Sequence, residues 1–398
     1  MLLATRIRRS RAPRETNRPI RTCAEYELPK GTVPQLDSVR GLAILLVLIY
    51  HANHVFPSAL SGVFERCWLG VDIFFVLSGF LITGILWRER GSEGYFKRFY
   101  GRRVLRIWPA YLLLLVFAFA LLPLTKRMIG GPLQEIPGEQ LGIWPYLLMI
   151  QNCFPRSLAL SAVLAVTWSL AIEEQFYLIW PAFIYKTSRR FLAPILGALF
   201  LAAPLIRSLL MSRGVSQLAI YYNPLTHGDS LILGALIAIL LRTGRYTRRF
   251  VLHSGLTLFL TSLGLFILLH PTKITSVYCS PFIFTIVALL GGGFLLIALV
   301  SQDLGYFFHE VVFKSPVLSF LGFISYSLYL FHYFIFHLGV SDKLMSILNK
   351  WHHPGFTRAL MMIVATGLSI VLSYISRITI ERHALSFKRL FDHVPKSS

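Results

Sequence analysis

The residues best suited to chemistry begin with Arg40 and His51, which bracket the apolar residues 41–50 in QLDSVRGLAILLVLIYH. Eleven residues make three α-helical turns plus about 20°, so both side chains share one face, about 16.5 Å apart along the axis. A charged group inside a bilayer costs roughly 2.5–3.5 kcal/mol, so such residues commonly serve a function or pair internally. The alternative is that Arg40 anchors the helix at the membrane surface and His51 is an interfacial residue.

Carboxylates occur in two other apolar segments. Asp72, in GVDIFFVLSGFLI, is predicted to lie near the depth of His51, where a carboxylate would orient an imidazole. Glu173 and Glu174, in WSLAIEEQFYLIWP, point about 100° apart on a helix, and Glu173 shares its face with Tyr177. The spacing places both about a dozen residues into a predicted span, which favours proton transfer by Glu173. An interfacial Asp72 and an arginine-paired Glu173 are the alternatives.

Arginines are concentrated in FKRFYGRRVLRIWPAY, where Arg102, Arg103 and Arg106 precede a further apolar run. Guanidinium groups bind phosphate oxygens bidentately, so the patch predicts a cytosolic phosphate-bearing ligand, with ordinary anchoring of the loop as the alternative.

Five polar or aromatic side chains in the apolar segments are predicted to contact a substrate: Trp168, Tyr177, Asn152, Asp229 and His332. For Asn152 the alternative is a residue that merely ends a helix. The four cysteines have no ligand spacing, so neither a metal site nor a disulfide framework is indicated.

Composition predicts a polytopic membrane protein. The mean hydropathy is +0.63, and only 14% of the 398 residues are charged. The net charge of +21 is divided among short segments between apolar runs, which indicates membrane topology rather than nucleic-acid binding.

The apolar runs predict an all-α bundle of about ten transmembrane helices with both termini cytoplasmic. Inner segments then carry 27 Lys and Arg residues and outer segments ten, as the positive-inside tendency requires. Counting 141–154 as an eleventh crossing would reverse that bias, so we interpret it as re-entrant or interfacial. The predicted spans are 37–56, 68–87, 104–124, 162–185, 191–211, 220–241, 250–269, 279–301, 316–338 and 357–380.

The predicted organisation has three parts. Residues 1–33 form a basic disordered cytoplasmic tail, 34–385 a single membrane domain, and 386–398 a cytoplasmic C-terminal tail.

Together the motifs resemble the acyltransferase type 3 family of integral membrane acyltransferases over about residues 34–385. They stand in family order as LDSVRGLAILLVLIYH, GVDIFFVLSGFLI, RRVLRIWPAY, WSLAIEEQFYLIWP and SYSLYLFH. The resemblance implies a ten-helix enzyme that transfers an acyl group, often acetyl, from cytosolic acyl-CoA to a hydroxyl of a glycan or another acceptor. It implies site roles for Arg40, His51, Arg103, Arg106 and Glu173.

Two features depart from the family. The chain has His227-Gly228-Asp229 where many members have an arginine before the aspartate. It also shows no extracytoplasmic SGNH domain, so we expect the final transfer to occur in the membrane domain or on a separate partner.

We therefore expect a multi-pass O-acyltransferase of a bacterial inner membrane, with acyl-CoA as donor substrate and no metal. Arg102, Arg103 and Arg106 would bind the donor, and His51 would be general base or transient acyl carrier, with Asp72 or Glu173 orienting it or relaying protons. The expected partners are the donor, a hydroxyl-bearing glycan or small metabolite and the lipid bilayer, without nucleic acid. Alternatives are a proton-coupled transporter using Glu173 and His51, and a scaffold without catalysis.

Cysteine-accessibility labelling tests the topology. Single cysteines in 125–140 should react from outside, and those in 186–190 and 242–249 only from inside. Outside labelling of Thr187→Cys would contradict the ten-span arrangement.

Overall fold

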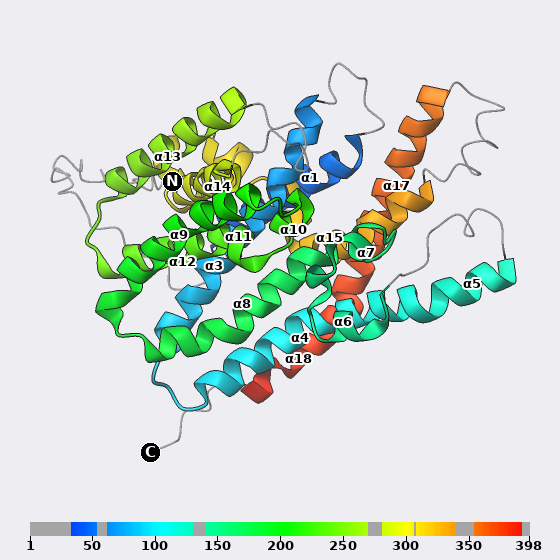
Figure 1. Ribbon diagram of the computed structural model, residues 1–398, viewed down its shortest axis with the longest axis horizontal. Coiled ribbons are helices and arrows are strands. Elements are labelled where there is room, and N and C mark those ends of the chain that lie inside the picture. The colour runs from blue at the N-terminus through cyan, green and yellow to red at the C-terminus, as the bar shows by residue number, and fades with distance from the viewer. Residues whose placement is uncertain are drawn as a thin grey trace, which may run out of the picture.

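The computed structural model describes residues 33–53, 62–129, 141–269, 281–305, 308–339 and 354–391. Throughout these ranges the chain forms helices, turns and loops without a strand, which confirms the predicted all-α class (Figure 1). Most of the predicted N-terminal tail, and residues 392–398 of the predicted C-terminal tail, lie outside the described residues.

Six helical segments in the described ranges are long and apolar enough to cross a membrane. They support a multi-pass membrane protein, whereas the ten-span count and the cytoplasmic termini stay predictions. The six segments are Gly62–Glu89, Tyr95–Met128, Arg189–Ser212, Arg248–Leu269, Phe308–Leu338 and Gly355–Phe391.

Each of the ten predicted ranges contains a helix or part of one. The principal helices are α1 (Pro34–His51), α3 (Gly70–Glu89), α4 (Tyr95–Val116), α8 (Thr167–Lys186), α9 (Arg189–Ser212), α12 (Asp229–Thr243), α13 (Arg248–Leu269), α14 (Ile283–Leu299), α15 (Pro316–Gly339) and α17 (Pro354–Ser376).

Two helices continue through a π-helical turn, a feature that is frequent at functional sites. One turn, Phe117–Leu121, joins α4 to α5 (Leu122–Ile129). The other, Arg377–Glu381, joins α17 to α18 (Arg382–Ser386), which lies beside α4 in Figure 1. The end of the described chain therefore packs on the arginine-bearing helix.

The segment 141–154 does not form a membrane-crossing helix. It contains α6 (Ile143–Leu147) and the 3₁₀ turn Gln151–Cys153, and α7 (Pro155–Ala159) follows. A five-residue helix extends about 7.5 Å, far less than the roughly 30 Å of a hydrocarbon core. The decision not to count this segment as a crossing is consistent with the structure.

The predicted continuous span 220–241 is wrong, because the chain there is broken into three helices. α10 (Gln217–Tyr221) and α11 (Pro224–His227) precede α12. The Asn223 side chain accepts a hydrogen bond from the Leu225 backbone N–H, which caps α11. Pro224 at the first position of α11 disfavours a helical conformation at Asn223, so α10 cannot continue through it.

The predicted start of the span 162–185 is also wrong, since α8 begins only at Thr167. The Ser161 hydroxyl accepts hydrogen bonds from the backbone N–H groups of Val163 and Leu164, which favours a turn over a helix there. Glu173 therefore lies less than two turns after the helix start, rather than a dozen residues into the span.

Helices α1 and α15 cross at backbone contact distance. A Cβ atom on Gly41 would overlap the carbonyl oxygen of Leu318, and one on Gly322 would overlap the carbonyl oxygen of Asp37. The hydroxyls of Ser38 and Ser319 hydrogen-bond across the same crossing at 3.0 Å. Small residues allow such close approach between membrane helices, so this crossing depends on both glycines.

Helices α3 and α12 cross in the same way. A Cβ atom on Gly79 would overlap the Leu231 carbonyl oxygen, and one on Gly234 would overlap that of Val76. The two glycine-dependent crossings therefore fix the position of α1 relative to α15 and of α3 relative to α12.

We expect Gly41→Ala to lower the free energy of unfolding by about 1–3 kcal/mol, because the added Cβ meets backbone that cannot change rotamer. Thermal unfolding of the purified protein in detergent measures the effect. Gly197→Ala in α9 is the matched control, because no atom lies within 4 Å of its added Cβ. Equal melting temperatures for the two variants would contradict the role of the crossing.

Candidate active site

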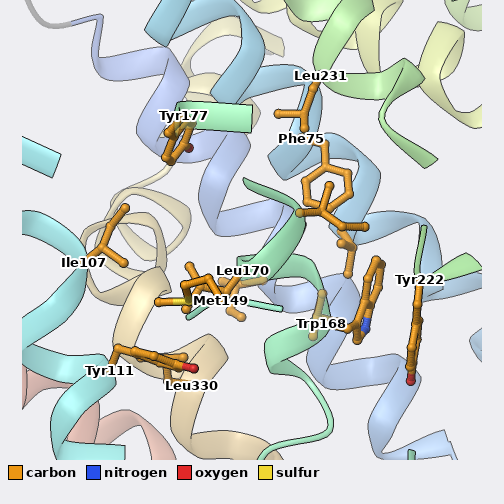
Figure 2. Packing of buried hydrophobic residues seen from close by; sticks show 14 of the residues in the cluster. Phe75, Ile107, Tyr111, Met149, Trp168, Leu170, Tyr177, Tyr222, Leu231 and Leu330 are labelled. Carbon is orange, nitrogen blue, oxygen red and sulfur yellow. The ribbon is translucent and has the colours of Figure 1, made fainter. Parts of the chain in front are cut away.

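A cavity of about 160 Å³ lies among α1, α3, α4, α8 and α15. Its charged lining consists of Arg40, Arg103, Arg106 and Glu173. Hydroxyl groups also face it, from Ser78, Ser169, Tyr177, Ser325, Tyr326 and Tyr329. Apolar lining residues that Figure 2 labels are Phe75, Ile107, Leu170 and Leu330.

The first arginine, Arg40, comes from α1 and forms an ion pair with Asp37 one turn earlier. Both side chains are partly exposed, so the pair itself adds little stability. Its position beside Arg103 and Arg106 brings together motifs that are far apart in the sequence.

Arg103 differs from Arg40 and Arg106, the other two arginines of the cavity, in its protein partners. Within the described part of the chain, no carboxylate lies within ion-pair distance of its guanidinium, and its buried Nε has no hydrogen-bond acceptor. Its guanidinium lies 5.9 Å from the centre of the Phe99 ring. A buried donor without an acceptor is costly, so Arg103 is suited to receive an anionic ligand in the cavity.

The other two arginines of the patch already have carboxylate partners. Arg106 is 3.2 Å from Glu381, a buried carboxylate that also pairs with Arg377 at 3.1 Å and accepts from Ser327 at 2.6 Å. Arg102 is 2.7 Å from Glu89 and is not among the lining residues. The three predicted donor-binding arginines therefore differ, since only Arg103 and Arg106 face the cavity.

Glu173 lines the cavity with Tyr177, one turn further along α8. The Ser78 hydroxyl donates to a Glu173 carboxylate oxygen at 2.6 Å, linking α3 to α8. Sequence reasoning did not select Ser78, although a hydroxyl in the middle of GVDIFFVLSGFLI is a polar group that needs a partner in an apolar helix. The neighbouring Glu174 has a buried carboxylate oxygen without a hydrogen-bond donor among the described residues.

His51 lies outside the cavity lining and pairs with His332 of α15. Its Nδ1 is 3.2 Å from His332 Nε2 and 3.0 Å from the Val47 carbonyl oxygen. His332 is fully buried, whereas His51 is partly exposed. The residue predicted as a substrate contact, His332, is thus the partner of the predicted catalytic histidine.

The prediction that Asp72 orients His51 does not match the structure. The Asp72 carboxylate lies 3.0 Å from His227 Nε2 and accepts from the Ser230 hydroxyl at 2.7 Å. The α3 and α12 crossing places these groups together, so the imidazole that Asp72 orients is that of His227. This pair is completely buried.

Asp229, predicted as a substrate contact, forms a buried ion pair with Arg207 of α9 at 3.0 Å. The Arg207 side chain is buried and also donates to the carbonyl oxygens of Thr226 and Pro281. This chain therefore supplies the buried arginine partner of Asp229 from another helix.

Trp168 and Asn152, also predicted as substrate contacts, lie in packed surroundings. The Trp168 and Tyr222 rings lie parallel (Figure 2), and their centroids are 5.2 Å apart. On Trp168 the His227 ring also stacks, with centroids 5.3 Å apart. Asn152 donates to the Tyr222 carbonyl oxygen and accepts from Gln175. These side chains contact other protein groups, whereas Tyr177 is the predicted substrate contact that lines the cavity.

Comparison with known families now identifies the class of protein. The family model described as an acyltransferase domain, that of the type 3 acyltransferases, matches residues 33–378. Since this match covers most of the chain, the chain belongs to the acyltransferase type 3 family, whose members transfer acyl groups other than amino-acyl groups.

Curated relatives carry more specific names. The chain is similar to peptidoglycan O-acetyltransferase OatA of Listeria monocytogenes, with 31% identity over 365 residues. It is also 31% identical over 362 residues to the putative peptidoglycan O-acetyltransferase YrhL of Bacillus subtilis. Each alignment covers 86% of this chain and 54% of the relative, so the chain spans about half the length of these proteins. No solved structure matches the chain.

Proposed function

We propose that this chain is an O-acetyltransferase of a bacterial inner membrane that moves an acetyl group from cytosolic acetyl-CoA to a hydroxyl of a cell-envelope glycan. The observation that carries the proposal is the cavity in which Arg103, which has no carboxylate partner among the described residues, lies with Arg40, Arg106 and Glu173. The names of the relatives support acetyl transfer and a glycan acceptor.

The donor would be bound through its phosphate groups. Coenzyme A carries several phosphate oxygens, and a guanidinium binds such oxygens bidentately. Three arginines and one carboxylate, that of Glu173, line the cavity. Two of these arginines form ion pairs, Arg40 with Asp37 and Arg106 with Glu381. The remaining cation, Arg103, is therefore the primary phosphate ligand in this proposal.

The acyl end of the donor would reach His51 along the α1 and α15 crossing. Arg40 and His51 are separated by about 16.5 Å along α1, a distance that the narrow pantetheine arm of coenzyme A can span. Tyr329 of α15 lines the cavity and packs 5.9 Å from the His332 ring, so one helix borders both places.

The transfer step needs a group that accepts the proton of the acceptor hydroxyl. We propose that His51 removes this proton as the hydroxyl oxygen bonds to the thioester carbonyl carbon. The carbon–sulfur bond then breaks, the thiolate of coenzyme A takes the proton from His51, and an acetyl ester is formed. In a two-step variant the His51 ring nitrogen first accepts the acetyl group, and both routes require a lone pair on that nitrogen.

Purified protein in vesicles, given labelled acetyl-CoA and a glycan acceptor, should release coenzyme A and label the acceptor. His51→Ala should reduce turnover by about 10²–10⁴-fold, the usual loss when acid–base catalysis is removed, with normal insertion. His253→Ala in α13 is the control for substituting a membrane-domain histidine. Transport of acetyl-CoA or glycan without thioester cleavage would contradict the enzyme and favour a carrier.

The arginine cavity gives a second test, in which Arg103→Lys keeps the charge but loses the bidentate fork. We expect it to raise the KM for acetyl-CoA about tenfold while leaving the KM for the acceptor unchanged, because only donor binding is weakened. Arg102→Lys is the matched control, since Arg102 pairs with Glu89 outside the cavity lining. An unchanged KM for acetyl-CoA in Arg103→Lys would exclude Arg103 as a donor ligand.

A further inference from the structure

The ring nitrogens of His51 and His332 lie in a short hydrogen-bonded series with two backbone carbonyl groups. His332 Nδ1 is 3.0 Å from the Leu328 carbonyl oxygen, and His332 Nε2 is 3.2 Å from His51 Nδ1. His51 Nδ1 is also 3.0 Å from the Val47 carbonyl oxygen. Carbonyl oxygens only accept hydrogen bonds, so they determine which nitrogens carry protons.

The proton positions can be assigned in order, starting from the Leu328 carbonyl oxygen at the His332 end of the series. His332 Nδ1 must donate to the Leu328 carbonyl oxygen, which leaves Nε2 of a neutral His332 as an acceptor. That acceptor faces His51 Nδ1, which then carries the proton and donates to both His332 Nε2 and the Val47 carbonyl oxygen. In neutral His51 the lone pair consequently resides on Nε2.

The opposite assignment is unfavourable at two places. If His332 Nε2 carried the proton and donated to His51 Nδ1, then His332 Nδ1 would present a lone pair to the Leu328 carbonyl oxygen. His51 Nδ1 would likewise present a lone pair to the Val47 carbonyl oxygen. Both repulsive contacts involve a buried or half-buried ring, where water cannot replace the lost hydrogen bonds.

We propose that His332 is a positioning residue that holds His51 in the Nδ1-protonated tautomer, so that Nε2 carries the lone pair used in acyl transfer. The inference rests on the proposed function, and it adds a residue that nothing in the family comparison assigns to the reaction. His332 acts through His51, because its own two nitrogens are both engaged and its ring is fully buried.

The surroundings restrict the orientation of both rings. Tyr333 of α15 meets the His51 ring edge-to-face with centroids 5.1 Å apart, and Phe336 packs edge-to-face on His332 at 5.6 Å. The α1 and α15 crossing sets the distance between the two rings. When His51 takes up a proton, its Nδ1–H still donates to the same two acceptors, so the rings need not rearrange during transfer.

Substitution of His332 separates the positioning role from packing. His332→Leu removes the acceptor for His51, whereas His332→Gln retains a side-chain amide oxygen that can accept from Nδ1–H. We expect His332→Leu to lower kcat about 10- to 100-fold with the KM for acetyl-CoA unchanged, because misorientation of a reacting group has effects of this size. His332→Gln should recover most of the lost kcat.

The matched control is His337→Leu on the same helix, since His337 is exposed and its Nδ1 lies beside the carbonyl oxygen of Tyr333, one turn earlier. It should keep the wild-type kcat. Wild-type kcat in His332→Leu, or an equal loss in the Leu and Gln variants, would overturn the positioning role.

Nuclear magnetic resonance of protein with labelled histidine tests the tautomer without any activity. His51→Ala identifies the His51 signals, and the ring carbon and nitrogen shifts should report protonation at Nδ1 in the wild type and a mixture of tautomers in His332→Leu. Protonation of neutral wild-type His51 at Nε2 would overturn the inference. A wild type that shows this tautomer but transfers no acetyl group would contradict the proposed function alone.

Discussion

The close crossing of α1 and α15 is the constraint on which the site depends. Gly41 and Gly322 each remove a side chain where the other helix presents a backbone carbonyl, and no larger residue fits at either place without moving a helix. The same two helices carry Arg40 and Tyr329 at the cavity and His51 and His332 at the imidazole pair. A change in the separation of these helices would therefore alter donor binding and imidazole geometry together.

Among the buried charged groups of the described residues, several form ion pairs that hold the fold, whereas Arg103 lines the cavity without a carboxylate partner. Asp72 pairs with His227, Asp229 with Arg207, and Glu381 with Arg106 and Arg377. Removing one partner from such a pair would leave a buried charge uncompensated, so these groups maintain helix positions. Arg103 differs because it lines the cavity, its buried Nε has no acceptor, and no carboxylate of the described residues lies within ion-pair distance of it, so the cavity is where an anionic donor would complete the site.

The sequence carried enough information to predict an all-α protein, its family and the residues Arg40, Arg103, Arg106 and Glu173, which the structure brings to one cavity. Periodicity and charge reveal such residues because polar groups in apolar helices are rare. The side-chain partners of these residues were harder to predict. His332 is 281 positions from His51, and their contact depends on how two helices cross. Asp72 was assigned to His51 from depth alone, and only the α3 and α12 crossing shows that its partner is His227. The breaks before α8 and α12 were missed because local caps at Ser161 and Asn223 override the apolar pattern.

The central claim, that the arginine cavity and the imidazole pair are two ends of one reaction site, is tested most directly by a cryo-electron microscopy structure with a non-hydrolysable acetyl-CoA analogue. We expect phosphate oxygens of the analogue within hydrogen-bond distance of the Arg103 guanidinium. We also expect the acyl carbon beside Nε2 of His51, with the His51 and His332 rings still paired. An analogue whose phosphates lie away from the cavity, or whose acyl group points away from α1 and α15, would contradict it.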